Sequence, residues 1–165
     1  MKKYGLAFCC VTMGLVFAVP AVAITEVQQE AIVNRCSKIR ELLQDAQRND
    51  VRNRVYLGGY YESILTDYIV PFNVRMVENN LSTPELVENQ NKISNTKALF
   101  ASDFIAYQQN LEDLLLINCK TEPAKFYEKL GIVQQKRKTV EQDTLKMHSL
   151  ISEHAKIATQ LMGKL

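Results

Sequence analysis

The chain has 165 residues with a formal net charge of +2, and 23% of its residues are charged. Two of its basic residues lie at positions 2 and 3, and without them 18 basic residues balance 18 acidic ones. A neutral protein offers no net attraction to a polyanion, so we expect no nucleic-acid partner. With only 6 glycines, 4 prolines and no tryptophan, the composition favours helices.

Residues 1–23 have the pattern of an export signal. Two lysines precede the apolar stretch GLAFCCVTMGLVFAV, and the small residues Ala21 and Ala23 form a signal-peptidase site. We therefore expect a mature chain that begins at Ile24 and is exported to the periplasm, the cell surface or the medium. The alternative is an uncleaved anchor, because about 20 uncharged residues are long enough to cross a bilayer. We expect membrane association only in that case.

The first mature segment, residues 26–78, has the apolar spacing of a helix. Its early stripe consists of Ile32, Cys36, Ile39, Leu43 and Ala46, and its later stripe of Leu57, Tyr60, Ile64 and Tyr68. Between them the pattern fails across QRNDVRNR. Gly58, Gly59 and Pro71 are further weak points, so we expect one long helix that is broken or kinked.

Two more helices are predicted over residues 84–118 and 122–163, each with an apolar stripe at alternate spacings of four and three that is typical of coiled coils. The last stripe consists of Phe126, Leu130, Val133, Arg137, Val140, Thr144, Met147, Ile151, His154, Ala158, Leu161 and Leu165. The short link NCKT predicts a helical hairpin. The sequence therefore predicts an all-α, elongated, antiparallel three-helix bundle, similar to a coiled coil, as a single domain over residues 24–165.

Cys36 and Cys119 are the two cysteines outside the predicted signal, and we expect a disulfide bond between them. Export brings a protein into an oxidising compartment, where pairing is the usual state. Two buried free thiols are the alternative. In a regular bundle the two cysteines would be offset by about 10 Å along the axis, whereas a bridge needs Cα atoms within about 7 Å. If the bridge forms, the first helix must lose length at a weak point.

No catalytic or metal site can be recognised in the sequence. His148 and His154 are six residues apart, so a helix points them in different directions. The chain has no Glu-x-x-His pair, no Cys-x-x-Cys motif and no glycine-rich phosphate loop. Met147 and His154 could ligate a haem, but their heptad spacing explains them as core residues. We therefore predict a protein that is not an enzyme and that has no metal and no cofactor.

The most distinctive stretch is VRNRVYLGGYYESILTDYIVPF, which combines tyrosine with arginine. Both residue types are favoured at protein-binding surfaces, because each offers a large contact area with a polar tip. The candidate partner-binding residues are Arg52, Arg54, Tyr56 and Tyr61. We expect Tyr56 and Tyr61 to be exposed, and Tyr60 and Tyr68 to fill the core with their hydroxyls at its edge.

Several segments resemble a group of uncharacterised exported all-helical proteins of candidate phyla radiation bacteria, the Saccharibacteria in particular. These segments are NRCSKIRELL, RVYLGGYYESIL, PFNVRMVENNL and DFIAYQQNLEDLLLINCK followed by FYEKL. The resemblance covers about residues 34–130 and includes no catalytic signature. It implies an envelope-associated or secreted protein whose partner is an envelope or host-surface protein. It indicates neither a particular activity nor an oligomeric state.

The leading functional prediction is an exported, non-enzymatic scaffold or protein-interaction module of the cell envelope. A periplasmic holdase chaperone is the first alternative, because ITEVQQ resembles the LTxxQ element of small helical stress chaperones. A cofactor-binding helical bundle is the second.

Overall fold

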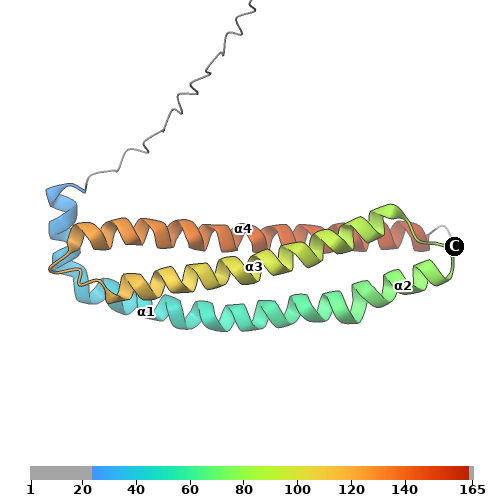
Figure 1. The fold of residues 1–165 in the computed structure, drawn as a ribbon, viewed down its shortest axis with the longest axis horizontal. Coiled ribbons are helices and arrows are strands. Elements are labelled where there is room, and N and C mark those ends of the chain that lie inside the picture. Colours follow the sequence, from blue (N-terminus) through green and yellow to red (C-terminus); the bar gives the residue numbers. More distant parts are fainter. Residues whose placement is uncertain (1–23, 164–165) are drawn as a thin grey trace, which may run out of the picture.

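The computed structural model describes residues 24–163, and these residues form helices and no strand (Figure 1). The elements are α1 (Glu26–Ser63), the π-helical turn η1 (Ile64–Ile69), α2 (Val70–Glu78), α3 (Pro84–Leu116) and α4 (Pro123–Met162). The prediction of an all-α fold is confirmed. The predicted signal, with Ala21 and Ala23 at its cleavage site, lies outside the described residues.

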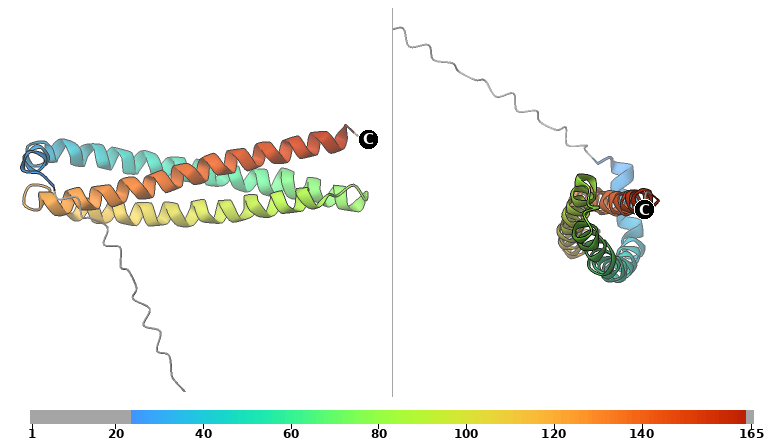
Figure 2. Two further views of the ribbon diagram at one scale, coloured as in Figure 1. Left: turned by 90° about the horizontal axis from the view of Figure 1, so that it is seen from above. Right: turned by 90° about the vertical axis from the view of Figure 1, so that its right-hand side faces the viewer.

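Three long rods lie side by side along the molecule (Figure 1). The segments α1, η1 and α2 follow one another without a gap and form the first rod, α3 runs back along it, and α4 turns again. Two further views show the same elongated shape from above and from one end (Figure 2). The helices α3 and α4 pack against each other far more extensively than either packs against α1.

Local signals in the sequence explain where the helices begin. The side chain of Thr25 accepts a hydrogen bond from the N–H of Gln28 at 3.3 Å, and the side chain of Gln28 accepts one from the N–H of Thr25 at 2.9 Å. This capping box satisfies donors that the first turn of α1 would otherwise leave free. Pro84 and Pro123 open α3 and α4, where a missing N–H costs little.

The predicted stripes of α3 and α4 form most of the core. Among the described members of the α4 stripe, all are buried or half-buried except Arg137. On α3 the stripe from Leu86 to Leu114 is buried or half-buried throughout. Neighbouring aromatic rings of Phe100, Phe104 and Tyr107 lie 6.2 and 5.7 Å apart between centroids. A continuous apolar core therefore runs between the two helices.

Two of the predicted breaks in the first helix are wrong. The helix α1 continues through QRNDVRNR and through Gly58 and Gly59. The apolar pattern fails at QRNDVRNR because Asp50 occupies the inward position there and is buried. The pattern was interrupted by a polar residue in the core and not by the end of a helix.

The irregular turn η1 lies directly before Pro71. Its closing bond joins the N–H of Val70 to the carbonyl of Leu65, five residues back. A proline has no N–H to donate, and its ring crowds the carbonyl four residues back in a regular helix. The wider turn accommodates Pro71, which is the one predicted weak point that coincides with an irregularity.

After the interruption at Asp50, the inward stripe of the first rod lies one residue later than predicted. Its buried members are Tyr61, Leu65 and Ile69, in place of the predicted Tyr60, Ile64 and Tyr68. Tyr60 is 42% exposed and Tyr68 is 68% exposed. Their predicted place in the core is therefore wrong, because the interruption at Asp50 hid the phase of the stripe, which already passes through Tyr61 before η1 begins.

The helix α1 also bends near its N-terminal end. Its first turns, blue in Figure 1, stand across the end of the bundle, whereas the remainder runs along it. The bend shortens the reach of α1 along the bundle axis, at a place that none of the predicted weak points marks.

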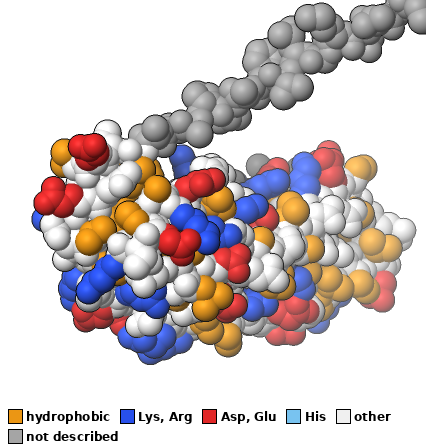
Figure 3. Space-filling view, turned by 60° about the vertical axis from the view of Figure 1, so that its left-hand side comes forward, with side chains coloured by type: hydrophobic (Ala, Val, Ile, Leu, Met, Phe, Trp, Pro, Cys, Tyr) orange, Lys and Arg blue, Asp and Glu red, His pale blue; other side chains and the backbone are white. Residues whose placement is uncertain are grey.

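Charged side chains of both signs are mixed on the surface. Figure 3 shows the end of the bundle that holds the α3–α4 link. On this face basic (blue), acidic (red) and hydrophobic (orange) side chains are intermixed, and neither charge forms a continuous patch. This distribution agrees with the balance of 18 acidic residues against 20 basic ones in the whole chain.

Candidate functional site

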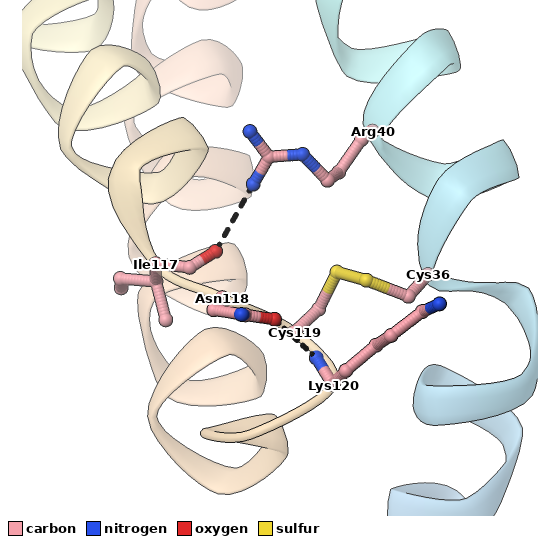
Figure 4. The surroundings of a disulfide bond; sticks show 6 residues. All are labelled: Cys36, Arg40, Ile117, Asn118, Cys119 and Lys120. Atoms are coloured by element: carbon pink, nitrogen blue, oxygen red, sulfur yellow. Dashed lines mark hydrogen bonds between the residues drawn. A yellow bond between two sulfur atoms is a disulfide. The ribbon is translucent and has the colours of Figure 1, made fainter.

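The disulfide between Cys36 and Cys119 fastens α1 to the link between α3 and α4 (Figure 4). The two Cα atoms are 5.6 Å apart. One turn further along α1, Arg40 donates a hydrogen bond to the backbone carbonyl of Ile117 at 3.2 Å. The predicted bond is confirmed, and a single face of α1 therefore holds the link at two points.

The link itself is a compact turn organised by Asn118. Its side-chain oxygen accepts a hydrogen bond from the N–H of Lys120 at 3.0 Å, and its carbonyl accepts from the N–H of Glu122 at 2.8 Å. These local bonds fix Cys119 in a fully buried position. The disulfide therefore joins two preformed elements.

The four residues predicted to bind a partner lie on two different sides of α1. Arg52 and Tyr56 are one helical turn apart on the outward side, where both are exposed and Tyr56 is 73% exposed. Arg54 and Tyr61 lie on the inward side. A helix of 3.6 residues per turn separates these pairs, so the four residues cannot form one surface.

The inward pair belongs to the core. Arg54 donates a hydrogen bond to the side chain of Gln108 at 3.2 Å, and its guanidinium lies 5.5 Å from the ring centroid of Phe104. Tyr61 is completely buried, with its ring edge-on to that of Phe100 at 5.5 Å. Burial raises the pKa of Tyr61 above its ordinary value. The predicted exposure of Tyr61 is wrong.

A polar cluster of Asp50, Tyr107 and Arg137 joins all three rods. Tyr107 on α3 donates its hydroxyl to Asp50 Oδ2 at 2.7 Å. Arg137 on α4 donates from Nε to Oδ2 and from Nη2 to Oδ1, each at 3.1 Å. The carboxylate of Asp50 is therefore paired on both oxygens, as a buried charge requires.

The environment of this cluster shifts two of its pKa values. Burial, followed by the hydrogen bond to Asp50, raises the pKa of Tyr107 well above its ordinary range. The hydrogen bond to Asp50 raises the pKa of Arg137. Tyr107 therefore stays a hydrogen-bond donor, and Arg137 stays charged, at every physiological pH. Neither of these two shifts moves a pKa toward neutrality, and the hydrogen bonds among the three side chains join α1, α3 and α4 as a structural bridge.

A cleft of about 320 Å³ opens beside the cluster. Its lining residues are Asp50, Asn53, Arg54, Leu57, Phe100, Phe104, Tyr107, Arg137, Val140, Glu141 and Thr144. Two arginines face two acidic residues, so the lining has no net charge. The lining contains no histidine, cysteine or methionine, which are the side chains that most often ligate haem or a soft metal.

The residues suggested as haem ligands lie elsewhere. Met147 is completely buried, and His154 is 6% exposed, so both are core residues as their spacing predicts. The Nδ1 atom of His154 lies 3.2 Å from the side-chain oxygen of Asn89. His148 is exposed, and its ring meets that of Tyr61 edge-on at 6.1 Å. Within residues 24–163 no three potential metal-ligating side chains come together.

The outward side of α1 carries the exposed aromatic surface. We call the exposed residues Val51, Arg52, Val55, Tyr56, Gly59, Tyr60 and Glu62 the outer α1 face. Val55 is 72% exposed, as large a fraction as that of Tyr56. The prediction identified Arg52 and Tyr56 but missed the valines and Tyr60. A second stripe at alternate spacings of three and four, through Arg52, Val55 and Gly59, is the signal that would have found Val55.

No described helix is both long and apolar enough to cross a membrane. Comparison of the chain with models of protein families, with curated proteins and with solved structures finds no match.

Proposed function

We propose that this protein is an exported, non-enzymatic interaction module, a rigid antiparallel helical bundle that docks another protein through its outer α1 face. Export follows in this proposal from residues 1–23, with cleavage after Ala23. The Cys36–Cys119 bond supports this location, because disulfides persist in oxidising compartments. The proposed partner is a protein of the cell envelope or of a host surface, a class that includes other exported copies of this chain.

The exposure of Val55, Tyr56 and Tyr60 carries the proposal. Large apolar side chains gathered on one helix face cost solubility, and tyrosine beside arginine is typical of binding surfaces. These side chains also lie on a helix whose position is fixed by the Cys36–Cys119 disulfide. A surface that is already rigid loses little conformational entropy when it binds.

The internal polar groups support a structural role for the remainder of the molecule. Asp50, Tyr107 and Arg137 satisfy one another, and Thr25 and Gln28 cap α1. The Thr and Gln that resemble a chaperone element therefore already have a structural role in this fold. Neither the holdase nor the cofactor-binding alternative is favoured by a specific contact.

Site-specific photocrosslinking in intact cells tests the proposal. A photoreactive phenylalanine analogue replaces Tyr56, and in a matched control it replaces the exposed Ser149 on α4. We expect one dominant crosslinked species from position 56 and none from position 149. Absence of any species specific to position 56, or identical species from both, would contradict docking through this face.

The predicted cleavage is tested separately by intact mass and N-terminal sequencing of the exported protein. We expect a chain that begins at Ile24. A retained N-terminus would instead support a membrane anchor.

A further inference from the structure

We propose that the partner of the outer α1 face is a second copy of this chain, bound antiparallel about a two-fold axis near residue 57. This pairing rests on the proposed function of that face. Three related features of α1 lead to this pairing: two glycines with open space beside them, a second heptad stripe that includes one of them, and the self-complementary order of charges along that stripe.

The space beside Gly58 and Gly59 is open within the single chain. A Cβ atom added to either would meet no other atom within 4 Å, as is also the case at Gly131 on α4, and neither residue has a positive φ. Glycine in a helix interior is destabilising relative to alanine. Close approach of another helix backbone is a physical reason to omit a side chain, and Gly59 lies exposed on the outer α1 face.

A second heptad stripe runs along the outward side of α1. Its members are Glu41, Asp45, Arg48, Arg52, Val55, Gly59, Glu62 and Thr66. Their alternate spacings of four and three match the spacing of residues that face a partner helix in a coiled coil. All of them are exposed except Asp45, which is half-buried. Tyr56 and Tyr60 flank the stripe and extend its apolar centre.

The order of residues along this stripe is complementary to its own reverse. When a second copy runs in the opposite direction about residue 57, Arg52 meets Glu62 and Val55 meets Gly59, and each contact forms twice. Such an isologous interface closes on itself as a dimer. A parallel arrangement in register would place Arg52 against Arg52, and like charges in contact oppose association.

The charges available for this pairing are accessible. Glu62 forms an ion pair with Lys97 on α3, yet its side chain remains 55% exposed. Arg52 is exposed as well. The stripe from Arg48 to Thr66 spans about 27 Å of helix. An interface of that length is at the small end for specific complexes, so we expect dissociation in the micromolar range.

Sedimentation velocity of the exported, oxidised protein at about 1–200 µM tests the pairing. Arg52→Glu and Glu62→Arg are each expected to raise the dissociation constant at least tenfold. The double variant Arg52→Glu/Glu62→Arg is expected to return it to near the starting value, because the pair is restored with its charges exchanged. Lys138→Glu, on the exposed side of α4, is the matched charge-reversal control and should leave the constant unchanged.

Gly59→Leu distinguishes a loss of dimerisation from a loss of folding. Leucine favours helix and meets open space within the chain, so thermal stability of the monomer should rise. The same side chain would separate the two helices, so dimerisation should be lost. Circular dichroism and sedimentation on one sample measure both effects.

Several outcomes would overturn the pairing. A monomer at every concentration, single variants that dimerise normally, or a double variant that fails to recover would each do so. If the purified protein is monomeric while position 56 still crosslinks to a different protein in cells, the second copy is wrong and the proposed function stands. If position 56 crosslinks to nothing, both fail.

Discussion

Asp50 on α1 and Arg137 on α4 form a bidentate ion pair between two helices that otherwise touch at few points. Their exposures are unequal, because the side chain of Asp50 is 12% exposed and that of Arg137 is 60% exposed. Water can therefore solvate Arg137 but not the carboxylate. The pair sets the position of α1 relative to the α3–α4 hairpin, together with the hydroxyl of Tyr107.

Replacement of Asp50 by alanine should destabilise the protein by about 1–3 kcal/mol. The loss comes mainly from the buried hydroxyl of Tyr107, which would have no acceptor, since Arg137 can turn to solvent. Urea denaturation monitored by circular dichroism measures the change. Asp45→Ala is the matched control, because its carboxylate is 48% exposed and pairs with Arg48 within its own helix. Equal effects of the two substitutions would contradict a structural role for the cluster.

Loss of the disulfide should be more costly. The bond closes a loop with a sequence separation of 83 residues, which corresponds to roughly 4 kcal/mol in the chain-entropy model. That is a large share of a typical net stability of about 5–15 kcal/mol. Cys36→Ser/Cys119→Ser should therefore lower the midpoint of denaturation strongly, and reduction of the wild-type protein should have the same effect.

Intact mass spectrometry provides the control for this prediction. The oxidised chain should be about 2 Da lighter than the reduced chain, because disulfide formation removes two hydrogen atoms. If reduction leaves both the mass and the denaturation midpoint unchanged, the cysteines are free thiols and the bridge does not form in the native protein.

The long helices could be predicted because their sequences repeat one simple rule. The stripes of α3 and α4 need only the spacing of apolar residues, and Pro84 and Pro123 mark the helix starts. The disulfide followed from the number of cysteines and the expected compartment. These signals are local or compositional, so one sequence is enough to detect them.

The first rod could not be predicted as well, because its core position at Asp50 is polar. Local sequence does not reveal that Tyr107 and Arg137, far along the chain, satisfy this carboxylate. The phase of the stripe beyond Asp50 was therefore hidden, and Tyr61 rather than Tyr60 lies in the core. The bend at the start of α1 has no breaking residue to mark it, so the local sequence did not indicate it.

The carboxylates of Asp103 on α3 and Asp143 on α4 interact with each other, so the protein should be more stable at mildly acidic pH than at neutral pH. Burial and the neighbouring carboxyl of Asp103 raise the pKa of Asp143 above its ordinary value of 3.8, and Lys146 opposes this shift only weakly. An acid whose folded-state pKa is raised binds protons more tightly when folded. Its destabilising effect is complete above that raised pKa and is relieved as the pH falls toward 3.8.

Asp143→Asn should therefore raise the melting temperature at neutral pH by about 2–4 °C if the repulsion costs near 1 kcal/mol. The gain should vanish at low pH, where wild-type Asp143 is protonated. Asp113→Asn, an exposed carboxylate on α3 that pairs with Lys129, is the control and should not stabilise. A constant gain at all pH values would show that packing and not charge is responsible.

The buried ring of His154 should instead make the protein less stable as the pH falls. Burial lowers its pKa below the ordinary value of 6.5, so the unfolded chain takes up a proton at a pH where the folded chain does not. Stability is therefore complete above pH 6.5 and falls as the pH drops from 6.5 toward the lower folded-state pKa. Below that pKa the loss is complete and no longer grows.

His154→Gln separates this contribution from that of Asp143. Glutamine cannot be protonated, so melting temperatures of the variant should no longer decline as the pH falls below 6.5. The variant is expected to be less stable at neutral pH, because it packs differently beside Asn89. His148→Gln is the control, since that histidine is exposed and should leave the decline intact. If His148→Gln removes the decline and His154→Gln does not, the buried ring is not its source. The pH of maximum stability should therefore be higher in Asp143→Asn than in the wild-type protein, and lower in His154→Gln.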